Sequence, residues 1–337
     1  MLLLISVDNE KGYSLIYIIL LLMSFSLTYF IKEYAIEKSF VATVNERSSH
    51  SVPTPHGGGI AIAITWLVGL LYLFFTNLIE SNLFYALLVG IVISIVSFFD
   101  DLYELSPKLR LIVQALVAIL GLYFLGGFEV LTLGVFDISF SVLTNLFALL
   151  MIIWFINLTN FIDGINGYVG SEFVFLSIAG FLLFGDAVFV VLGVAVLGFL
   201  YWNFNKAKIF MGDVGSTLLG YNIAIFTIYY ANTESTNFWV WIVLFSLFWF
   251  DATITLIRRK LNGEKLSQAH KKHAYQRLTQ ASWSHFKVTN YSIVVNIILF
   301  SIVYMVSNLF VALILSILLL SGIMYFIETK KAFDTQG

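Results

Sequence analysis

Apolar runs about twenty residues long recur along almost the whole chain, and they constrain its fold more than any other feature. A helix needs about 20 apolar residues to cross the ~30 Å hydrocarbon core of a bilayer. Each of the apolar ranges 168–203 and 290–327 could be one long kinked helix. Gly185-Asp186 and Ser307-Asn308 instead favour a tight turn that divides each range into two spans. We count eleven candidate spans: 13–31, 57–76, 83–99, 109–126, 141–157, 168–184, 187–203, 214–231, 238–257, 290–307 and 309–327. The runs predict an all-α integral membrane protein, a bundle of about 10–11 transmembrane helices.

The composition agrees with this fold class. Hydrophobic residues make up 60% of the chain and charged residues only 11%, whereas soluble domains carry about 25% charged residues. No long polar stretch separates the apolar runs, so we expect residues 1–337 to form a single polytopic domain. The first run is not followed by a small-residue cleavage site, which favours a retained span over a signal peptide.

The distribution of Lys and Arg predicts the orientation. If the N-terminus lies outside, all of the eighteen Lys and Arg except Lys11 fall on the inside, Arg110 at the inner mouth of the fourth span. Positive charge of this kind marks cytoplasmic loops. The inside segments are then 32–56, 100–108, 158–167, 204–213, 258–289 and 328–337. Every unusual polar cluster of the sequence falls in or beside these segments, so we expect a site on the cytoplasmic side.

Two adjacent acids, Asp100 and Asp101, close the third predicted span. They stand at a helix C-terminus, where the helix dipole disfavours negative charge. Their presence therefore suggests a compensating cation, which could be a metal ion or the nearby Lys108 and Arg110. The alternative is a solvated turn before Pro107.

A second cluster, at 157–167, spaces Asn157, Asn160 and Asp163 three residues apart. This spacing places them on one face of a helix if the helix continues. Amides and a carboxylate suit ribose hydroxyls, a uracil edge or a hydrated metal. The alternative is a helix C-cap whose polar residues face water.

A third cluster surrounds Asp213, which lies between glycines at the start of the eighth predicted span. The free N–H groups of a helix start attract phosphate, and a carboxylate there can hold Mg²⁺ beside a diphosphate. Lys206 and Lys208 favour an anionic ligand. The alternative is an Asp that only caps the helix.

A fourth cluster contains His270, His273 and Arg277, which could line one face of a short helix. Phosphate binding by imidazole and guanidinium groups fits these residues better than zinc, because a full ligand set is not evident. For Lys271 and Lys272 we favour a basic surface held by anionic lipid.

Two further features are candidates. Segment 47–59 holds two of the chain's three prolines and then three glycines, so we expect a stiff loop that carries Arg47, His50 and His56. Asp251 lies inside the ninth predicted span, where pairing with a neighbouring helix and a catalytic role are both open.

Taken in order, PTPxGGG (53–59), the Asp-Asp pair, NxxNxxDGxxG (157–167), MGDxGS (211–216) and the histidine loop (269–278) resemble the polyprenyl-phosphate N-acetylhexosamine-1-phosphate transferases. That superfamily includes the enzymes that begin O-antigen and teichoic acid linkage units and the phospho-MurNAc-pentapeptide translocase. The histidine loop looks most like the O-antigen branch that uses FucNAc or QuiNAc. Many relatives carry Asp where Asn166 stands and Arg where His56 stands.

The resemblance implies a Mg²⁺-dependent enzyme of the bacterial plasma membrane, with Mn²⁺ as a replacement ion. The reaction would convert a UDP-sugar and polyprenyl phosphate into polyprenyl-diphospho-sugar and UMP, as the first membrane step of O-antigen synthesis. UDP-GlcNAc and UDP-MurNAc-pentapeptide are alternative donors. A transporter is the distant alternative, but transporters place ionisable residues near mid-membrane. The expected partners are the two substrates and the bilayer, with a homodimer left open and no nucleic acid.

The same resemblance assigns roles to the candidate residues. Asp213 would be the principal Mg²⁺ ligand, with Asp100 as a second ligand. Asp100, Asp101 and Asp163 would be catalytic, one of the first two orienting or deprotonating the lipid phosphate. The substrate-binding residues would be Asn157, Asn160, Arg47, His50, His56, Lys108, His270, His273 and Arg277.

Overall fold

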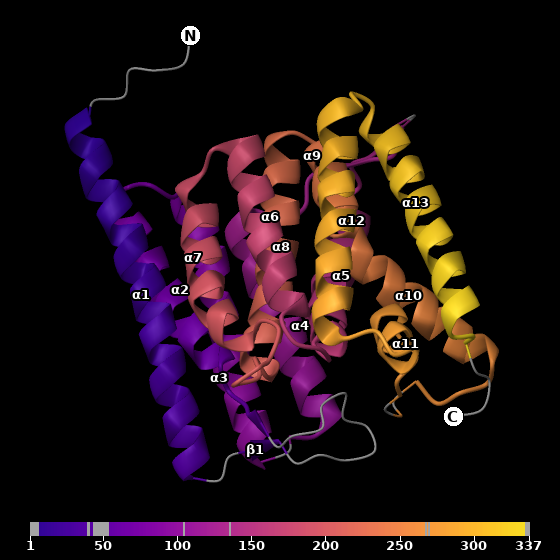
Figure 1. Cartoon of the computed structure of the whole chain (residues 1–337). Helices are drawn as coiled ribbons and strands as arrows, with labels where there is room; N and C mark the ends of the chain where they lie inside the picture. The colour runs from indigo at the N-terminus through magenta and orange to yellow at the C-terminus, as the bar shows by residue number, and fades with distance from the viewer. Residues whose placement is uncertain are drawn as a thin grey trace.

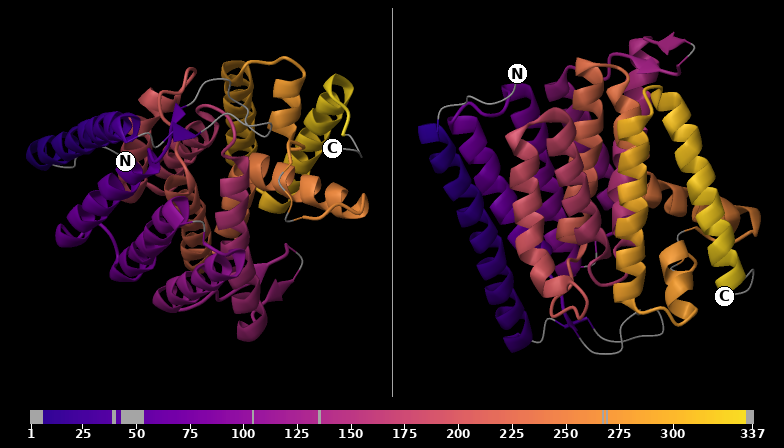
Figure 2. Two further views of the ribbon diagram at one scale, coloured as in Figure 1. Left: turned by 90° about the horizontal axis from the view of Figure 1, so that it is seen from below. Right: turned by 45° about the horizontal axis from the view of Figure 1, so that its top comes forward.

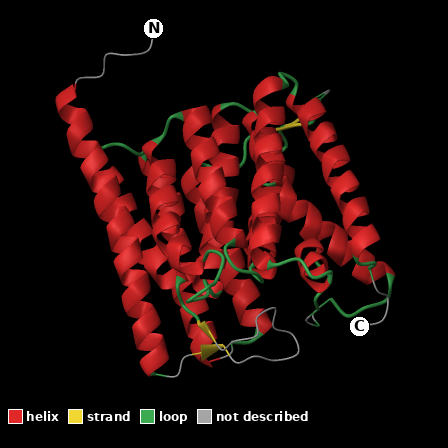
Figure 3. Cartoon of the chain, in the orientation of Figure 1, coloured by secondary structure: helices red, strands yellow, loops and turns green. Residues whose placement is uncertain are grey.

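The computed structural model describes residues 7–38, 41–42, 54–103, 105–134, 136–266, 268 and 270–333. Over these residues the chain is a helix bundle with two short antiparallel hairpins (Figures 1 and 3). The hairpins pair β1 (Val41–Ala42) with β2 (Thr54–Pro55), and β3 (Leu131–Thr132) with β4 (Asp137–Ile138). The helices are α1 (Val7–Glu37), α2 (Gly59–Phe75), α3 (Ser81–Tyr103), α4 (Pro107–Leu125), α5 (Ser141–Ile162), α6 (Tyr168–Phe184), α7 (Ala187–Asn203), α8 (Asp213–Thr233), α9 (Asn237–Leu244), α10 (Ser246–Leu261), α11 (Ala274–Gln280), α12 (His285–Met305) and α13 (Leu309–Lys330).

The predicted all-α membrane fold is confirmed. Among the described residues, six helices are long and apolar enough to cross a membrane, and the bent pair α9–α10 would make a seventh. Helices α2, α6 and α7 are apolar but shorter, at 17 residues each. Each of the eleven predicted spans coincides with one of these helices, with α8, or with the α9–α10 pair. The two pairs that could have been kinked helices are separate, because Gly185 ends α6 with a φ of 78° and residues 306–308 divide α12 from α13.

The helices alternate in direction, so their connections fall at two ends of the bundle. Helices α1, α3, α5, α7 and α13 end at the lower end of Figure 1, and α2, α4, α6, α8 and α12 begin there. Helix α11 and the end of α10 also lie at this end, which the left view of Figure 2 faces. We call it the charged end, because its connecting segments carry nearly all the Lys and Arg of the sequence. The hairpin β3–β4 lies at the opposite end.

Helix α8 lies inside the bundle. Every residue from Val214 to Ile228 is buried, including the polar Ser216, Thr217, Asn222 and Thr227. It packs against α3, where the Tyr221 hydroxyl donates to the Ala86 carbonyl (2.7 Å) and the Thr217 and Ser97 hydroxyls are 3.0 Å apart. Because α8 begins at Asp213, this central position brings Asp213 among the ends of its neighbours.

The ninth predicted span, 238–257, is not a single straight helix, which corrects the sequence-based expectation. The chain bends by 70° between α9 and α10, at Phe245. Helix α10 buries Asp251 and Arg259, and a charge within hydrocarbon is costly. The bend carries both charges to the charged end, where they bond to the backbone of the following segment. No proline or glycine marks the bend, so the usual sequence signal of a kink is missing.

Candidate functional site

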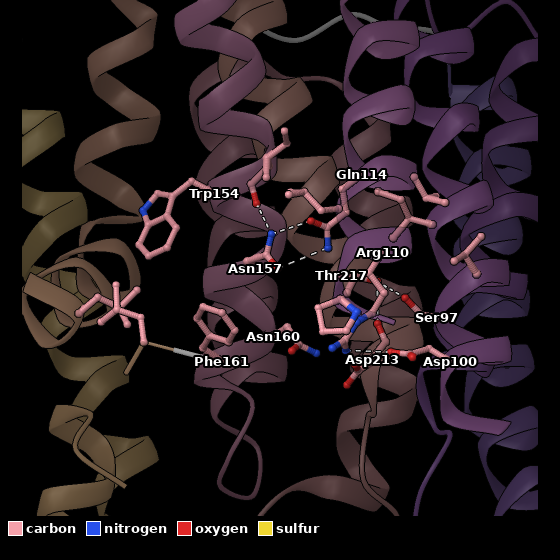
Figure 4. Close-up of a pocket in the computed structure, with 18 of the residues that line it drawn as sticks. Ser97, Asp100, Arg110, Gln114, Trp154, Asn157, Asn160, Phe161, Asp213 and Thr217 are labelled. Atoms are coloured by element: carbon pink, nitrogen blue, oxygen red, sulfur yellow. Dashed lines mark hydrogen bonds and ion pairs between the residues drawn. The ribbon is translucent and has the colours of Figure 1, made fainter. Parts of the chain in front are cut away.

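A cavity of about 870 Å³ opens between α3, α4, α5, α8, α10 and the segment before α11 (Figure 4). Its polar part lies at the charged end and includes Asp100, Arg110, Asn160 and Asp213. Farther along α3, α4 and α5 its walls become apolar. This apolar lining includes Ile93, Leu111, Val113, Leu150 and Ile153. The cavity therefore continues from a charged centre into an apolar channel along the helices.

Two motifs that are far apart in the sequence form one backbone unit beside the cavity. The Phe210 N–H donates to the Pro55 carbonyl (2.8 Å), and the Gly59 N–H donates to the Met211 carbonyl (2.8 Å). A Cβ atom at Gly59 would lie 2.3 Å from the Gly215 nitrogen, so only glycine permits this approach of α2 to α8. The glycines of PTPxGGG and MGDxGS therefore fix the position of the α8 start.

Asp213 is the first residue of α8, as predicted. The preceding Gly212 has a φ of 74°, a conformation that favours glycine. The Asp213 carboxylate accepts a hydrogen bond from Asn160, whose amide also donates to the Ser216 hydroxyl (3.2 Å). Three other acids, from two other segments, lie within electrostatic reach of Asp213: Asp100 and Asp101 of α3, and Asp163 after α5.

The two adjacent acids of α3 point in different directions. Asp100 accepts from the Arg110 guanidinium (2.9 Å) and from the Leu105 N–H (2.7 Å). Asp101 instead approaches the loop before α8, since a Cβ atom at Gly212 would lie 3.5 Å from its Oδ2. Of the cations expected beside this pair, Arg110 thus compensates Asp100, but not Asp101.

Asn157 and Asn160 line the cavity, but Asp163 is not on their helix. Helix α5 ends at Ile162, and Asp163 follows as its C-cap, where it accepts from the Gly212 N–H. Burial and the nearby Asp213 raise the pKa of Asp163 to about 7. The three residues therefore converge by a helix and its cap, and not by one continuous helical face as expected.

The histidine segment forms one wall of the cavity. His270 and His273 both line it, and His273 is the N-cap of α11 with its Nδ1 3.5 Å from Asp251 Oδ1. Burial and the neighbouring His273 lower the pKa of His270 to about 3. His270 is therefore neutral at pH 7 and can take part in hydrogen bonds, but carries no positive charge there.

Arg277 does not join these histidines, which is a correction. Helix α11 begins only at Ala274, so the three residues do not share a helical face. Arg277 is 2% exposed, its side chain donates to Glu328 (2.5 Å) and to the Lys331 carbonyl, and it does not line the cavity. A direct contact with substrate phosphate does not fit this position.

The remaining predicted residues differ in their placement. His56 lies beside the α8 start, where burial lowers its pKa although Asp213 opposes the shift. Lys108 is exposed on the first turn of α4 and does not line the cavity. Asp251 accepts from the Ala274 N–H (2.9 Å) and so caps α11. Of the two roles left open for Asp251, the structure thus supports pairing with a neighbouring helix. Arg47 and His50 lie outside the described residues.

Two amides that organise the site were not predicted from the sequence. The Gln114 side chain faces Asn157 in the cavity and accepts from its amide (2.7 Å; Figure 4). A glutamine inside an apolar span is a signal that could have identified it. Asn203 accepts from the Gly167 N–H (2.7 Å) and donates to the Ile209 carbonyl (2.9 Å). It ties the loop after Asp163 to the loop before Asp213.

Fold and cavity together define an integral membrane protein with a polar centre at one end of its bundle. Residues 83–231 match Glycosyl transferase family 4. The chain is 32% identical over 290 residues to the "Probable undecaprenyl-phosphate N-acetylglucosaminyl 1-phosphate transferase" of Bacillus subtilis, an alignment that covers 80% of this chain and 78% of the relative. The chain belongs to glycosyl transferase family 4, as the motifs predicted, and it is a membrane-embedded transferase.

Two other relatives carry related names. The chain is 28% identical over 305 residues to the "Decaprenyl-phosphate N-acetylglucosaminephosphotransferase" of Mycobacterium tuberculosis, over 78% of this chain and 75% of the relative. It is 29% identical over 184 residues to the "Phospho-N-acetylmuramoyl-pentapeptide-transferase" of Streptococcus pneumoniae, over 50% and 56%. The family match covers α3 to α8 and therefore Asp100, Asp101, Asp163 and Asp213. The histidine wall of the cavity, formed by His270 and His273, lies beyond the match.

Proposed function

We propose that the protein transfers an N-acetylhexosamine 1-phosphate from a UDP-sugar to polyprenyl phosphate, giving polyprenyl-diphospho-sugar and UMP. The observation that carries this proposal is the amphipathic cavity, in which a charged centre continues into an apolar channel. A lipid phosphate has the same division, with an anionic head and a hydrocarbon chain. The names of the three relatives support the same reaction.

The chemistry is an in-line substitution at phosphorus. An oxygen of the lipid phosphate forms a bond to the β-phosphorus of the UDP-sugar, and the bond from that phosphorus to the bridging oxygen breaks, so UMP leaves with that oxygen. Both reactants are anions, so positioning and charge neutralisation dominate catalysis. Arg110 supplies one positive charge at the cavity floor, although Asp100 already accepts from it.

The acids fit a Mg²⁺ ion held jointly with substrate. In the described part of the chain, no three His, Asp or Glu side chains lie close enough to hold a metal by themselves. Mg²⁺ in phosphate-transferring sites uses one or two carboxylates, waters and substrate phosphates, and Asp213 with Asp100 can provide that share. The bound ion would neutralise the diphosphate and activate it as an electrophile. Mn²⁺ should substitute for it.

The other residues receive roles from their positions. Asp101 points at the loop before Asp213 and would orient or deprotonate the lipid phosphate. Asn157 and Asn160 would bind the nucleotide, Asp163 would hold the metal's water shell or a substrate hydroxyl, and His270 and His273 would hydrogen-bond to the sugar or diphosphate. Each of these residues except Asp101 and Asp163 lines the cavity.

The sugar is best tested with a panel of donors. Two relatives are named for N-acetylglucosamine, whereas the pattern of residues 269–278 favours FucNAc or QuiNAc and a role in O-antigen initiation. Membranes that contain the protein should convert one radiolabelled UDP-N-acetylhexosamine into a lipid-extractable product. No lipid product from UDP-GlcNAc, UDP-FucNAc, UDP-QuiNAc or UDP-MurNAc-pentapeptide, with folded protein present, would refute the proposed reaction.

The site should face the cytoplasm of a bacterial plasma membrane, with the N-terminus outside. The Lys and Arg distribution supports this orientation. The chain has no cysteine, so single cysteines report cleanly. We expect Ser282→Cys, at the charged end, to resist an impermeant thiol reagent in intact cells, and Thr236→Cys, at the opposite end, to react. The reverse labelling pattern would contradict the proposed topology.

A further inference from the structure

The end of α13 is tied to both elements that flank the histidine wall. The Glu328 carboxylate accepts two hydrogen bonds from Arg258 of α10, at 3.0 and 3.2 Å. It also accepts one from Arg277 of α11, at 2.5 Å, and one from the Phe333 N–H, at 2.9 Å. Bidentate bonds between guanidinium and carboxylate are strong and fix orientation as well as distance. One carboxylate thus joins three separate segments of the chain.

The ring of Phe333 completes this junction. The Arg258 guanidinium carbon lies 4.1 Å from the ring centroid, and Arg277 and Lys272 each have a cationic group 5.6 Å from it. Cations over an aromatic face are attracted by its quadrupole. We call Glu328, Phe333, Arg258 and Arg277 the C-terminal clamp.

The clamp adds to other contacts of the same segment, among them the Tyr275 hydroxyl, which donates to the Phe161 carbonyl (3.2 Å), and Lys272, which pairs with Glu264 (2.9 Å). Arg277 lies four residues after His273, and α11 begins between them. Asp251 caps the start of α11 through the Ala274 N–H, but the other end of this short helix is held through Arg277. Upstream, Arg259 donates to the Lys265 and Gln268 carbonyls, at 2.7 and 3.0 Å. The chain that carries His270 is therefore held by buried arginines on both sides.

We propose that Glu328 is a positioning residue of the transferase, which fixes α11 through Arg277 and Arg258 and thereby holds His270 and His273 against the cavity. Glu328 does not line the cavity itself. It lies nearly a hundred residues beyond the family match, which ends at residue 231. The inference rests on the proposed function, because it takes the histidine wall to contact the donor substrate.

Glu328→Gln removes the charge that both arginines share and keeps the side-chain shape. Because a small misplacement of a positioned group can cost roughly 100-fold in rate, we expect kcat/KM for the UDP-sugar to fall by about 10- to 100-fold. The KM for the lipid phosphate should stay near the wild-type value, since the substitution does not change the apolar part of the cavity along α3, α4 and α5. Glu328→Asp, which keeps the charge, should recover part of the loss.

Glu33→Gln is the matched control. Glu33 also pairs with a cationic side chain, Lys32 at 2.6 Å, but it lies on α1 away from the histidines. Its kinetics should equal those of the wild type. All variants are compared as folded protein in detergent, with the melting temperature recorded, so loss of material cannot imitate loss of positioning.

A second readout does not depend on turnover. Trypsin cleaves after Lys265, Lys271 and Lys272, which lie in the clamped segment, and we expect faster cleavage there in Glu328→Gln than in wild type or Glu33→Gln. Unchanged cleavage together with unchanged kinetics would refute the clamp. If wild type turns over no donor while cleavage accelerates in Glu328→Gln, the proposed function fails and the positioning stands. If both KM values are unchanged and only the amount of folded protein falls, the role is structural and the inference is wrong.

Discussion

Acidic residues at the two ends of the bundle differ in their surroundings. At the end opposite the charged end, three acids each have a partner close in sequence or on a packed neighbour: Asp186 accepts from the Tyr230 hydroxyl, Glu80 bonds to Tyr229, and Glu234 accepts from Thr236 (2.8 Å). At the charged end, four acids from α3, the α5 cap and the α8 start converge, and Arg110 lies 2.9 Å from Asp100. Acids with local partners stabilise a fold, whereas acids gathered from distant segments leave negative charge for a ligand to neutralise.

The comparison is tested most severely by a pair of matched variants. We expect Asp213→Asn to lower turnover by about 100- to 1,000-fold, because it removes a carboxylate that would carry metal charge stabilisation worth several kcal/mol. Asp186→Asn, at the opposite end, should leave turnover within about twofold, since it changes only a contact with Tyr230 far from the cavity. Both proteins should accumulate in the membrane. Equal activity of the two variants would remove the distinction between the ends.

Chelation sharpens the same contrast. If the convergent acids hold Mg²⁺ with the diphosphate, EDTA should abolish transfer, and added Mg²⁺ or Mn²⁺ should restore it. Undiminished turnover in excess chelator would mean that the acids are neutralised in another way, and the metal role of Asp213 would have to be abandoned.

The next effect concerns the two neighbours on α3. Asp100 is bonded to Arg110 while Asp101 approaches Gly212, so the single Asn variants should not be equivalent. Asp100→Asn should chiefly raise the Mg²⁺ concentration needed for half-maximal rate. Asp101→Asn should lower kcat by roughly 10- to 100-fold at saturating metal, as expected for loss of acid–base or orienting action. Asp101→Asn should not lower the melting temperature, because the helix dipole disfavours this acid, whereas Asp100→Asn also loses its ion pair with Arg110. Identical kinetic defects in the two variants would contradict the assignment.

Much of this site could be predicted from the sequence. Apolar length alone located the helices, because each span must satisfy its backbone internally and cover the hydrocarbon core. Asp100, Asn160 and Asp213 were found as polar residues at span ends, and alternating helices necessarily bring such ends to one side of a bundle. The glycines around Asp213 were also readable, since a positive φ and a close backbone approach both need glycine.

Other features depend on packing that no local pattern records. Arg277 looked like a phosphate ligand because it follows two histidines, but its partner, Glu328, lies on another helix. The bend at Phe245 carries no proline or glycine, and it is explained only by the partners that Asp251 and Arg259 find beyond it. Asp163 was placed on the face of Asn160 because the sequence does not say that α5 ends one residue earlier.

The smallest expected effect is on the pH dependence of stability. Burial lowers the pKa of His270 to about 3 from an ordinary 6.5, so the folded state prefers neutral His270. Its contribution to stability is fully present above pH 6.5 and is lost as the pH falls from 6.5 towards 3. His270→Gln cannot titrate, so its melting temperature should decline less than that of the wild type between pH 7 and pH 4. Parallel declines would show that His270 is not held neutral by the fold.

The central claim is that phosphorus, and not only sugar, moves to the lipid. A UDP-sugar labelled with ³²P in the β-phosphate, given to purified protein with polyprenyl phosphate and Mg²⁺, tests it most directly. The account predicts that the β label enters the lipid extract, whereas an α label leaves as UMP in the aqueous phase. If the β label stays in the aqueous phase as UDP while the sugar enters the lipid, the protein transfers a sugar alone, and the mechanism assigned to the convergent acids is wrong.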